Sequence, residues 1–232
     1  MKLLLKVIIL LSFINVSSQE KKYPPPMIAV DSLYREDQFY LGFTYNSLFN
    51  TPPGISQNKF SAGFTGGFLR DMPINKKRNV AIAAGLGLSY NKCFQNMNIS
   101  ETDQTITYSE IPEGTDYSKN KLEELFVDLP VEFRWRTSTP ESHKFWRIYT
   151  GLKLSYLIYD KYVYVNQGIT DVITKNDNIN NIQFGAYLAC GYNTWNFYAY
   201  YGIIPMFDSS AQINGEQVGF NILNLGLMFY IL

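Results

Sequence analysis

Large apolar side chains alternate with small or polar ones along most of the chain, and this alternation begins near residue 38. Residues 80–91 show it clearly, with mostly valine, isoleucine, leucine and tyrosine at one parity and glycine, alanine and serine at the other. A period of two is the signature of a β-strand, and the helical period of 3.6 is nearly absent. The pattern predicts eight strands, at residues 38–46, 59–69, 80–91, 124–136, 145–159, 182–192, 195–204 and 222–231.

The two faces of these strands differ in a way that distinguishes a membrane barrel from a soluble one. One face is continuously large and apolar, and the other is rich in glycine, serine and charged residues. In a soluble barrel the small face would line a core too empty to pack, whereas in a membrane barrel the large apolar face meets lipid. Each predicted strand is also close to the about 9–11 residues that a tilted strand needs to cross a bilayer. We therefore predict an all-β fold, an eight-stranded antiparallel transmembrane β-barrel of the outer-membrane type.

The links between the predicted strands alternate between long and short. The first, third, fifth and seventh links are long, whereas the others are short, down to the two residues Asn193 and Thr194. Outer-membrane barrels have short periplasmic turns and long external loops. We therefore expect an outer-membrane location with the N-terminus in the periplasm, on the same side as the turns at residues 70–79 and 137–144.

The start of the chain predicts a secretion signal. Met1 and Lys2 form a short basic start, residues 3–16 are largely apolar, and small residues fit a cleavage before Gln19. A membrane anchor is the weaker interpretation, because a spanning helix needs about 20 apolar residues. The predicted domains are a signal peptide at residues 1–18, a periplasmic N-terminal segment at residues 19–37 and the barrel at residues 38–232. The prolines at residues 24–26 favour an extended segment, either a periplasmic tail or a plug of the lumen.

Composition fits a membrane barrel and argues against a nucleic-acid partner. The chain has 18 Tyr, 16 Phe and 3 Trp, together 16% of its residues, and this enrichment fits the aromatic belts of membrane barrels. Basic and acidic residues are equal at 20 each, so the basic excess typical of nucleic-acid binding is missing. Cys93 and Cys190 lie in or beside predicted strands, where buried or lipid-facing thiols are favoured and a single disulfide is the alternative.

The sequence offers little for catalysis or for a cofactor. A Ser/His/acid site needs a histidine, and His143 lies in a predicted turn beside Glu141 and Ser142, where adjacent residues cannot generally converge as a triad. No cluster of His, Cys and Asp has the spacing of a metal site. We expect no enzyme activity, no cofactor and no small-molecule substrate. An outer-membrane hydrolase that depends on His143 is the alternative.

Charged residues share the inward parity of the fourth and fifth predicted strands. They are Asp128, Glu132, Arg134, Arg136, Arg147 and Lys153. Ions on that face are costly unless they pair or reach water. The favoured interpretation is a salt-bridged lumen that stiffens the barrel, formed by Asp128, Glu132, Arg134, Arg147 and Lys153, and the alternative is a polar channel or docking surface. Free conduction of solutes is not expected, because an eight-stranded barrel is generally filled by its own side chains.

The predicted turn at residues 70–79 is long and basic. The plain interpretation is a solvated turn. The functional alternative is a surface on which a periplasmic partner docks. Its candidate residues are Arg70, Asp71, Lys76, Lys77 and Arg78, together with Arg136 at the end of the fourth predicted strand.

Several stretches of the chain resemble the PorT family, outer-membrane components of the type IX secretion system. The matching stretches are residues 31–40 (DSLYREDQFY), 67–75 (GFLRDMPIN), 78–87 (RNVAIAAGLG), 129–141 (LPVEFRWRTSTPE), 144–151 (KFWRIYTG) and 191–198 (GYNTWNFY). They span essentially the whole chain after the predicted signal peptide. Most of them fall on the predicted periplasmic turns and the adjoining strand ends.

The resemblance implies a role in moving folded cargo proteins with C-terminal sorting domains across the outer membrane, including surface adhesins in gliding bacteria. It implies no catalytic residue and no cofactor. The expected partners are outer-membrane lipid and other type IX secretion components. The alternative function is a general small porin-like or structural outer-membrane barrel.

Overall fold

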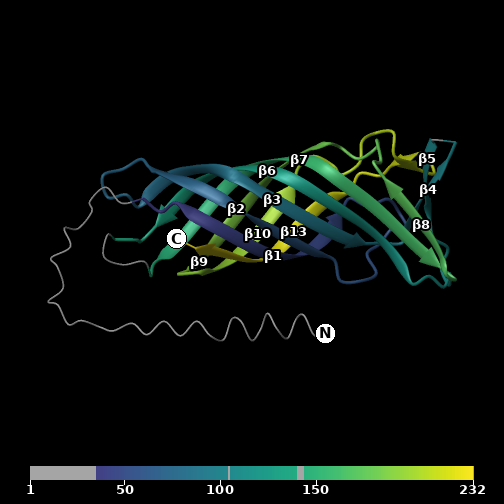
Figure 1. Ribbon diagram of the computed structural model, residues 1–232, viewed down its shortest axis with the longest axis horizontal. Coiled ribbons are helices and arrows are strands. Elements are labelled where there is room, and N and C mark those ends of the chain that lie inside the picture. Colours follow the sequence, from purple (N-terminus) through teal and green to yellow (C-terminus); the bar gives the residue numbers. More distant parts are fainter. Residues whose placement is uncertain (1–34, 104, 140–143, 232) are drawn as a thin grey trace, which may run out of the picture. The chain divides into compact units, whose positions relative to one another are not determined.

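The computed structural model describes residues 35–103, 105–139 and 144–231. The predicted signal peptide, most of the predicted N-terminal segment and His143 lie outside the described residues. Antiparallel strands form one sheet in the order β6-β3-β2-β1-β13-β10-β9-β7, and pairing of β6 with β7 closes this sheet into a barrel (Figure 1). None of the described residues forms a helix long and apolar enough to cross a membrane.

The eight strands of the barrel are those that the alternation predicts, with shifted ends. They are β1 (Gln38–Phe49), β2 (Ala62–Pro73), β3 (Val80–Phe94), β6 (Lys119–Arg136), β7 (Trp146–Asn166), β9 (Ile182–Tyr192), β10 (Trp195–Gly202) and β13 (Asn221–Ile231). The predicted fold class is therefore confirmed, and so is the alternation of long and short links. The two-residue link is a turn in which Asn193 has a φ of 56°, a conformation that Asn tolerates better than most residues.

The long links contain strands that the sequence pattern did not predict. These strands are β4 (Met97–Thr102) and β5 (Thr105–Glu110), which form a hairpin, β8 (Ile169–Thr174), which extends the sheet along the end of β7, and the short β11 (Gln212–Ile213) and β12 (Glu216–Gln217). In Figure 1, β4, β5 and β8 gather at the end of the barrel opposite the C-terminus. We call this the loop end, and the opposite end, where β2–β3, β6–β7 and β9–β10 connect, the short-turn end.

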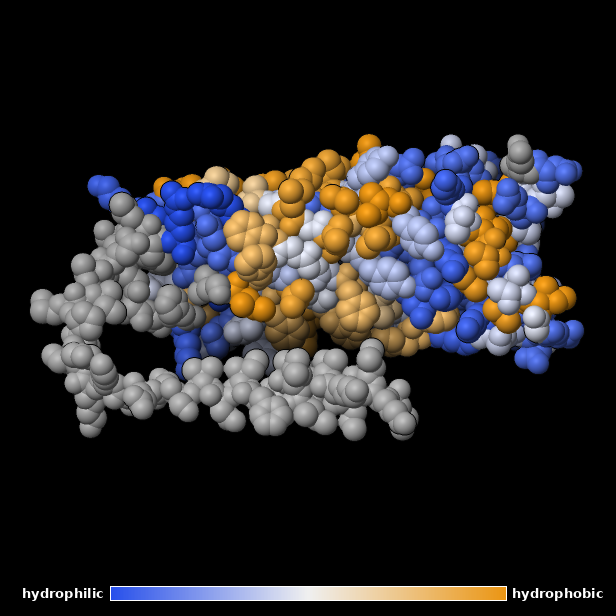
Figure 2. Space-filling model, in the orientation of Figure 1, coloured by the Kyte–Doolittle hydropathy of each residue, from blue (hydrophilic) through white to orange (hydrophobic). Residues whose placement is uncertain are grey.

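The outward face of the barrel is a band of exposed apolar side chains. On β6 this band runs from Leu125 to Trp135, with Leu129, Val131 and Phe133 about half exposed. At about 3.3 Å per residue and a tilt of about 40°, this stretch rises roughly 25 Å, the height of the lipid-facing band in outer-membrane barrels. Figure 2 shows the band on the face in view as a mainly orange zone in the middle of the barrel, with mostly blue residues towards both ends. A continuous apolar surface of this size would be unfavourable in water, so the band faces lipid.

Aromatic side chains mark both borders of the band. Trp135, Trp146 and Trp195 all point outward at the short-turn end, with 40%, 60% and 63% of their surfaces exposed. Outward tyrosines mark the border nearer the loop end, among them Tyr45, Tyr90, Tyr156, Tyr159 and Tyr201. Amphipathic rings favour the interface between lipid and water, so the two belts give the limits of the membrane on the barrel.

Above the tyrosine border the two faces of the barrel exchange character. On β6, Lys119, Lys121 and Glu123 point outward, while Leu122 points inward between the buried Asn120 and Glu124. On β7 the change is helped by an irregularity at Ile158, which has no partner in the pairing of Tyr159 with Leu125 and of Leu157 with Phe126. The outward face of this part of the barrel is therefore polar, and apolar side chains join the buried polar ones inside, as burial from water favours.

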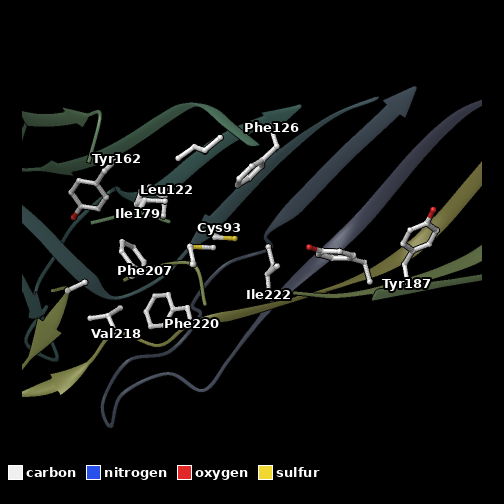
Figure 3. Close-up of a cluster of buried hydrophobic side chains, with 14 of the residues drawn as sticks. Cys93, Leu122, Phe126, Tyr162, Ile179, Tyr187, Phe207, Val218, Phe220 and Ile222 are labelled. Carbon is white, nitrogen blue, oxygen red and sulfur yellow. The ribbon is translucent and has the colours of Figure 1, made fainter. Parts of the chain in front are cut away.

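The loop end is closed by an apolar cluster, part of which is shown in Figure 3. Cys93, Leu122, Ile179, Phe207 and Phe220 are each at most 1% exposed. The cluster combines barrel strands with the long links, and the rings of Phe207 and Phe220 meet edge to face at 5.6 Å. Tyr108 of the β4–β5 hairpin donates a hydrogen bond to Asn176, and burial raises its pKa. The long links are therefore packed over the mouth of the barrel and cap it.

Tyrosines fill the lumen against glycines of neighbouring strands. Gly151 is paired with Tyr187 across β7 and β9, and a Cβ at Gly151 would lie 2.7 Å from the ring of Tyr187 and 2.5 Å from the backbone carbonyl oxygen of Val131. Tyr40 occupies the space beside Gly67 and Gly87 in the same way. The buried lumen tyrosines are Tyr40, Tyr149, Tyr187, Tyr198, Tyr200 and Tyr230. The aromatic enrichment therefore serves the inside of the barrel as well as the lipid belts, to which the composition alone assigns it.

We predict that Gly151→Ala destabilises the barrel by about 1–3 kcal/mol, because the new methyl group displaces the Tyr187 ring from a packed lumen. The measurement is urea unfolding of the protein folded in detergent, followed by tryptophan fluorescence. Gly66→Ala is the matched control: Gly66 lies on the lipid-facing parity of β2, and its Cβ would meet only a flexible Leu41 methyl at 3.0 Å and a carbonyl at 3.4 Å. Equal unfolding midpoints for the two variants would contradict the packing argument.

Candidate functional site at the short-turn end

Backbone pairing brings distant parts of the sequence together at the short-turn end. Val80 at the start of β3 lies opposite Trp135 of β6, and Arg136 lies opposite Arg147 of β7. Trp146 at the start of β7 is paired with Tyr192 of β9. The ends of β2, β6, β9 and β13 and the starts of β1, β3, β7 and β10 therefore form one rim with a shared interior.

A buried ion-pair network occupies the lumen inside this rim. Asp71 on β2 accepts two parallel hydrogen bonds from Arg136, each 2.8 Å long, and a third of 3.0 Å from Nη1 of Arg134. Nε of Arg134 also donates to Glu132 at 2.7 Å. The side chains of Asp71, Arg134 and Arg136 are 0% exposed. Buried charges at this density are tolerated only because they are paired with good geometry.

Residues that precede β1 complete the network. The carbonyl of Glu36 accepts a hydrogen bond of 3.2 Å from Nη1 of Arg134, and the amide of Glu36 donates to Asp71 at 3.4 Å. The carboxylate of Asp37 accepts from the amide of Asp71 at 2.7 Å. Glu36 is 1% exposed. The last residues of the predicted N-terminal segment are thus fixed inside the mouth of the barrel.

Aromatic rings surround the remaining charges of the network. Glu132 accepts hydrogen bonds from the hydroxyls of Tyr187 at 2.9 Å and Tyr230 at 3.3 Å. The guanidinium of Arg134 lies 4.7 Å from the centre of the Tyr149 ring. Arg147 is 2% exposed, and its guanidinium lies over the rings of Phe145, Tyr149 and Tyr230 at 4.5–5.7 Å. Ring faces offset part of the cost of burying these cations.

A second group of polar side chains lies deeper in the lumen, around Asp128. Its carboxylate accepts hydrogen bonds from Ser155 at 2.6 Å and Ser89 at 3.1 Å, and lies 3.4 Å from Nζ of Lys153. The ammonium of Lys153 also lies 4.3 Å from the centre of the Tyr200 ring. Of the five residues predicted to form a lumen network, the structure pairs Glu132 with Arg134 and Asp128 with Lys153. Arg147 forms no ion pair with a described residue.

The lumen leaves no room for a conduit among the described residues. One cavity of about 20 Å³ is lined by Ser89, Asn91, Glu124, Lys153 and other residues of the upper lumen. Another of about 10 Å³ lies beside Tyr40, Glu132, Tyr187 and Tyr230. Each has space for roughly one water molecule. The lumen in the described part of the chain is therefore a packed interior.

The predicted docking residues divide between the surface and the interior. Arg70, Lys76 and Lys77 are exposed, and Arg78 is half-buried with a φ of 53°. The expectation was wrong for Asp71 and Arg136, which bind each other inside the lumen and are not accessible to a partner. The predicted turn at residues 70–79 is also shorter, because β2 continues to Pro73. Arg136 still connects the buried docking residues to the exposed turn, since its Nε donates a hydrogen bond to the carbonyl of Arg78 at 3.1 Å.

Sequence reasoning missed the central acid of this network. Asp71 has the same parity as Leu69, which points inward on β2, so extending the alternation by one step would have placed it in the lumen. Glu36 and the lumen tyrosines were missed as well. No local pattern reveals Glu36, because it precedes the first strand and reaches Arg134 only in the folded barrel.

The remaining candidate chemistry is limited in the described residues. Cys93 and Cys190 are free thiols, the first inside the lumen and the second on the lipid-facing parity of β9, so the disulfide alternative is wrong. Residues 35–103, 105–139 and 144–231 contain no group of three or more His, Cys, Asp or Glu side chains placed to hold a metal ion.

A comparison with known protein families agrees with this architecture. A sequence model of a protein family, described as an outer membrane protein beta-barrel domain, matches residues 17–208. Among solved structures, the chain is similar to Ail, the attachment invasion locus protein of Yersinia pestis, in complex with the heparin analogue sucrose octasulfate. That similarity has a TM-score of 0.37 and 12% identity, and covers 85% of this chain and 99% of that chain. No curated protein matches the sequence.

We predict that Asp71→Asn lowers the stability of the barrel by about 3–5 kcal/mol, because it leaves Arg134 and Arg136 buried without their shared carboxylate. The free energy of unfolding in urea, measured on the protein folded in detergent, tests this. Asp116→Asn, the same change at an exposed residue of a long link, should leave that free energy unchanged. A similar loss in both variants, or in neither, would show that the network does not stabilise the barrel.

Proposed function

This chain belongs to the family of outer membrane protein beta-barrel domains, and on that premise we propose that it is a non-enzymatic component of type IX secretion. Its barrel spans the outer membrane. In the proposal, the short-turn end faces the periplasm and contacts other components of the secretion machinery. Cargo proteins with C-terminal sorting domains, including gliding adhesins, then cross the membrane with its assistance.

The observation that carries the proposal is the gathering of the PorT-like stretches at one end of the barrel. These stretches include the start of β1, the link from β2 to β3, the end of β6, the start of β7 and the turn from β9 to β10. They are scattered over more than half of the sequence, and the pairing of the strands joins them into one rim. A barrel that served only to span the membrane would not need these PorT-like stretches to gather at one end.

The charges of the rim support a docking role for the same end. Arg70, Lys76 and Lys77 are exposed beside the membrane border that Trp135 marks. Beneath them, the bonds from Arg136 to Asp71 and to the carbonyl of Arg78 connect the exposed turn to the buried network. A basic surface on a rigid support suits an acidic partner, because charge complementarity speeds association and fixes orientation.

The packed lumen argues against a porin-like barrel, whereas a structural outer-membrane barrel stays the alternative function. Its described interior cavities hold roughly one water molecule each, so solutes have no path through them. The hydrolase alternative depends on His143, which lies outside the described residues. We therefore propose that the barrel acts through contacts at its rim.

Complementation of a gene deletion tests the secretion role. The deletion should abolish export of cargo with C-terminal sorting domains, and the unchanged gene should restore it. Lys76→Glu/Lys77→Glu should not restore export although the barrel still assembles, because the basic rim becomes acidic. The measurement is cargo in the culture medium, with heat-modifiable migration on gels as the assembly control.

Lys119→Glu/Lys175→Glu makes the same charge change at exposed residues of the loop end and should restore export. Normal export in the deletion strain would refute the secretion role. Full restoration by Lys76→Glu/Lys77→Glu would refute the rim as its docking surface.

Cysteine labelling tests the proposed orientation. A membrane-impermeant maleimide should label Glu113→Cys, an exposed position in a long link, in intact cells. It should label Lys76→Cys only after the outer membrane is permeabilised, because the short-turn end faces the periplasm. The unchanged chain gives the background from its own thiols. The opposite labelling order would show that the barrel is inverted.

A further inference from the structure

Basic side chains cluster on one part of the outward face, directly above the tyrosine border. Lys92 of β3 and Lys161 of β7 lie on either side of Glu123 of β6, each as its direct cross-strand partner. Lys121 lies two residues before Glu123 on the same face of β6 and forms an ion pair with it. These three lysines surround one acid, so the cluster has an excess of positive charge.

The cluster belongs to this part of the barrel and is not a uniform belt. The structure describes every residue of β1, β9, β10 and β13, and none of these strands contains a lysine or an arginine. The lysine chains are also only partly exposed, and Nζ of Lys92 lies 5.0 Å from the centre of the Phe94 ring. Partial exposure is typical of lysines at a membrane interface, where the apolar stem covers neighbouring surface and the charge reaches water.

An apolar groove lies on the same face, immediately below the lysines. It has a volume of about 550 Å³ and runs over β13, β1, β2, β3 and β6. Its floor is formed by Gly66, which has no side chain, and the neighbouring Leu41, Phe64 and Leu88 line its sides. Its upper end is at Tyr90 and Leu125, two residues along the strands below Lys92 and Glu123. The hydroxyl of Tyr90 donates to Glu123 at 2.8 Å, which joins the groove to the cluster.

We propose that this groove and the three lysines form a binding site for a phosphorylated glycolipid of the lipid A type. An acyl chain lies in the groove, and phosphate groups lie against Lys92, Lys121 and Lys161. The inference rests on the orientation proposed above, in which the loop end, and the membrane leaflet next to it, lie on the external side of the outer membrane.

The arrangement fits a lipid with more than one phosphate. Lys92 and Lys161 are separated by two strand spacings, roughly 10 Å, which exceeds the size of a single phosphate. Ammonium groups bind phosphates as point charges, so a row of lysines accommodates phosphates at several positions. Glu123 holds Lys121 in place through their ion pair and opposes the anion when the lipid binds.

Lipid binding to the full chain, purified and folded in mild detergent, tests the proposal. Bisphosphorylated lipid A is titrated in, and bound lipid is counted by native mass spectrometry. Each lysine near an anionic lipid surface contributes about fivefold in affinity, so Lys92→Gln/Lys121→Gln/Lys161→Gln should weaken binding on the order of a hundredfold. Lys76→Gln/Lys77→Gln/Lys144→Gln, which removes three exposed lysines at the short-turn end, is the matched control and should bind lipid A as the unchanged protein does.

Two further variants separate the parts of the site. Glu123→Gln should tighten binding, because it removes the acid that opposes the phosphates and releases Lys121. Gly66→Val should weaken binding at unchanged folding, because its side chain fills the floor of the groove. Unchanged binding by Gly66→Val would overturn the role of the groove.

Three results would overturn the lipid site as a whole. They are equal affinity of the triple lysine variant and the unchanged protein, equal affinity for lipid A without phosphates, and equal affinity for phosphatidylglycerol. Binding is measured on purified protein, so its failure leaves the secretion proposal intact. Normal export in a deletion strain would likewise leave the binding result unaffected.

Discussion

An eight-stranded barrel encloses an interior that its own side chains must fill, and here that interior also contains buried cations. Asp71 meets this constraint at one point, because its two carboxylate oxygens accept hydrogen bonds from both Arg134 and Arg136. Tyrosines meet it elsewhere by lying against glycines, as Tyr187 does at Gly151, while its hydroxyl binds Glu132. The packing of the lumen and the pairing of its buried charges are therefore linked, because Tyr187 takes part in both.

The membrane and the water above it impose opposite demands on the same strands. β6 satisfies both, with charges inward and apolar residues outward through the bilayer, and with Leu122 inward and Lys121 outward beyond it. The strand is thus longer than a bilayer crossing requires, because its second part forms the wall of a capped soluble barrel. The long links are ordered by this second part, since Phe207 and Phe220 pack into its apolar interior.

The alternation of large and small residues was enough to predict the eight barrel strands, because the bilayer requires a continuous apolar face on each of them. It failed for β4, β5 and β8, which stand beyond the membrane where no such face is needed. Parity also placed Asp128, Glu132, Arg134, Arg147 and Lys153 in the lumen. It did not reveal which of them pair, because Asp71 and Glu36 come from strands and segments distant in the sequence. Pairing depends on barrel closure, a three-dimensional relation that no single segment contains.

The two ends of the barrel are built differently, which bears on what each can do. At the loop end the long links pack against one another and against an apolar core, so their surface is largely determined by the need to cap the barrel. At the short-turn end the turn that contains Lys76 and Lys77 is exposed, and it is connected to the buried network through the bond from Arg136 to the carbonyl of Arg78. The stability of the barrel gains little from such exposed charges, so the proposed docking role, and not the fold, accounts for them.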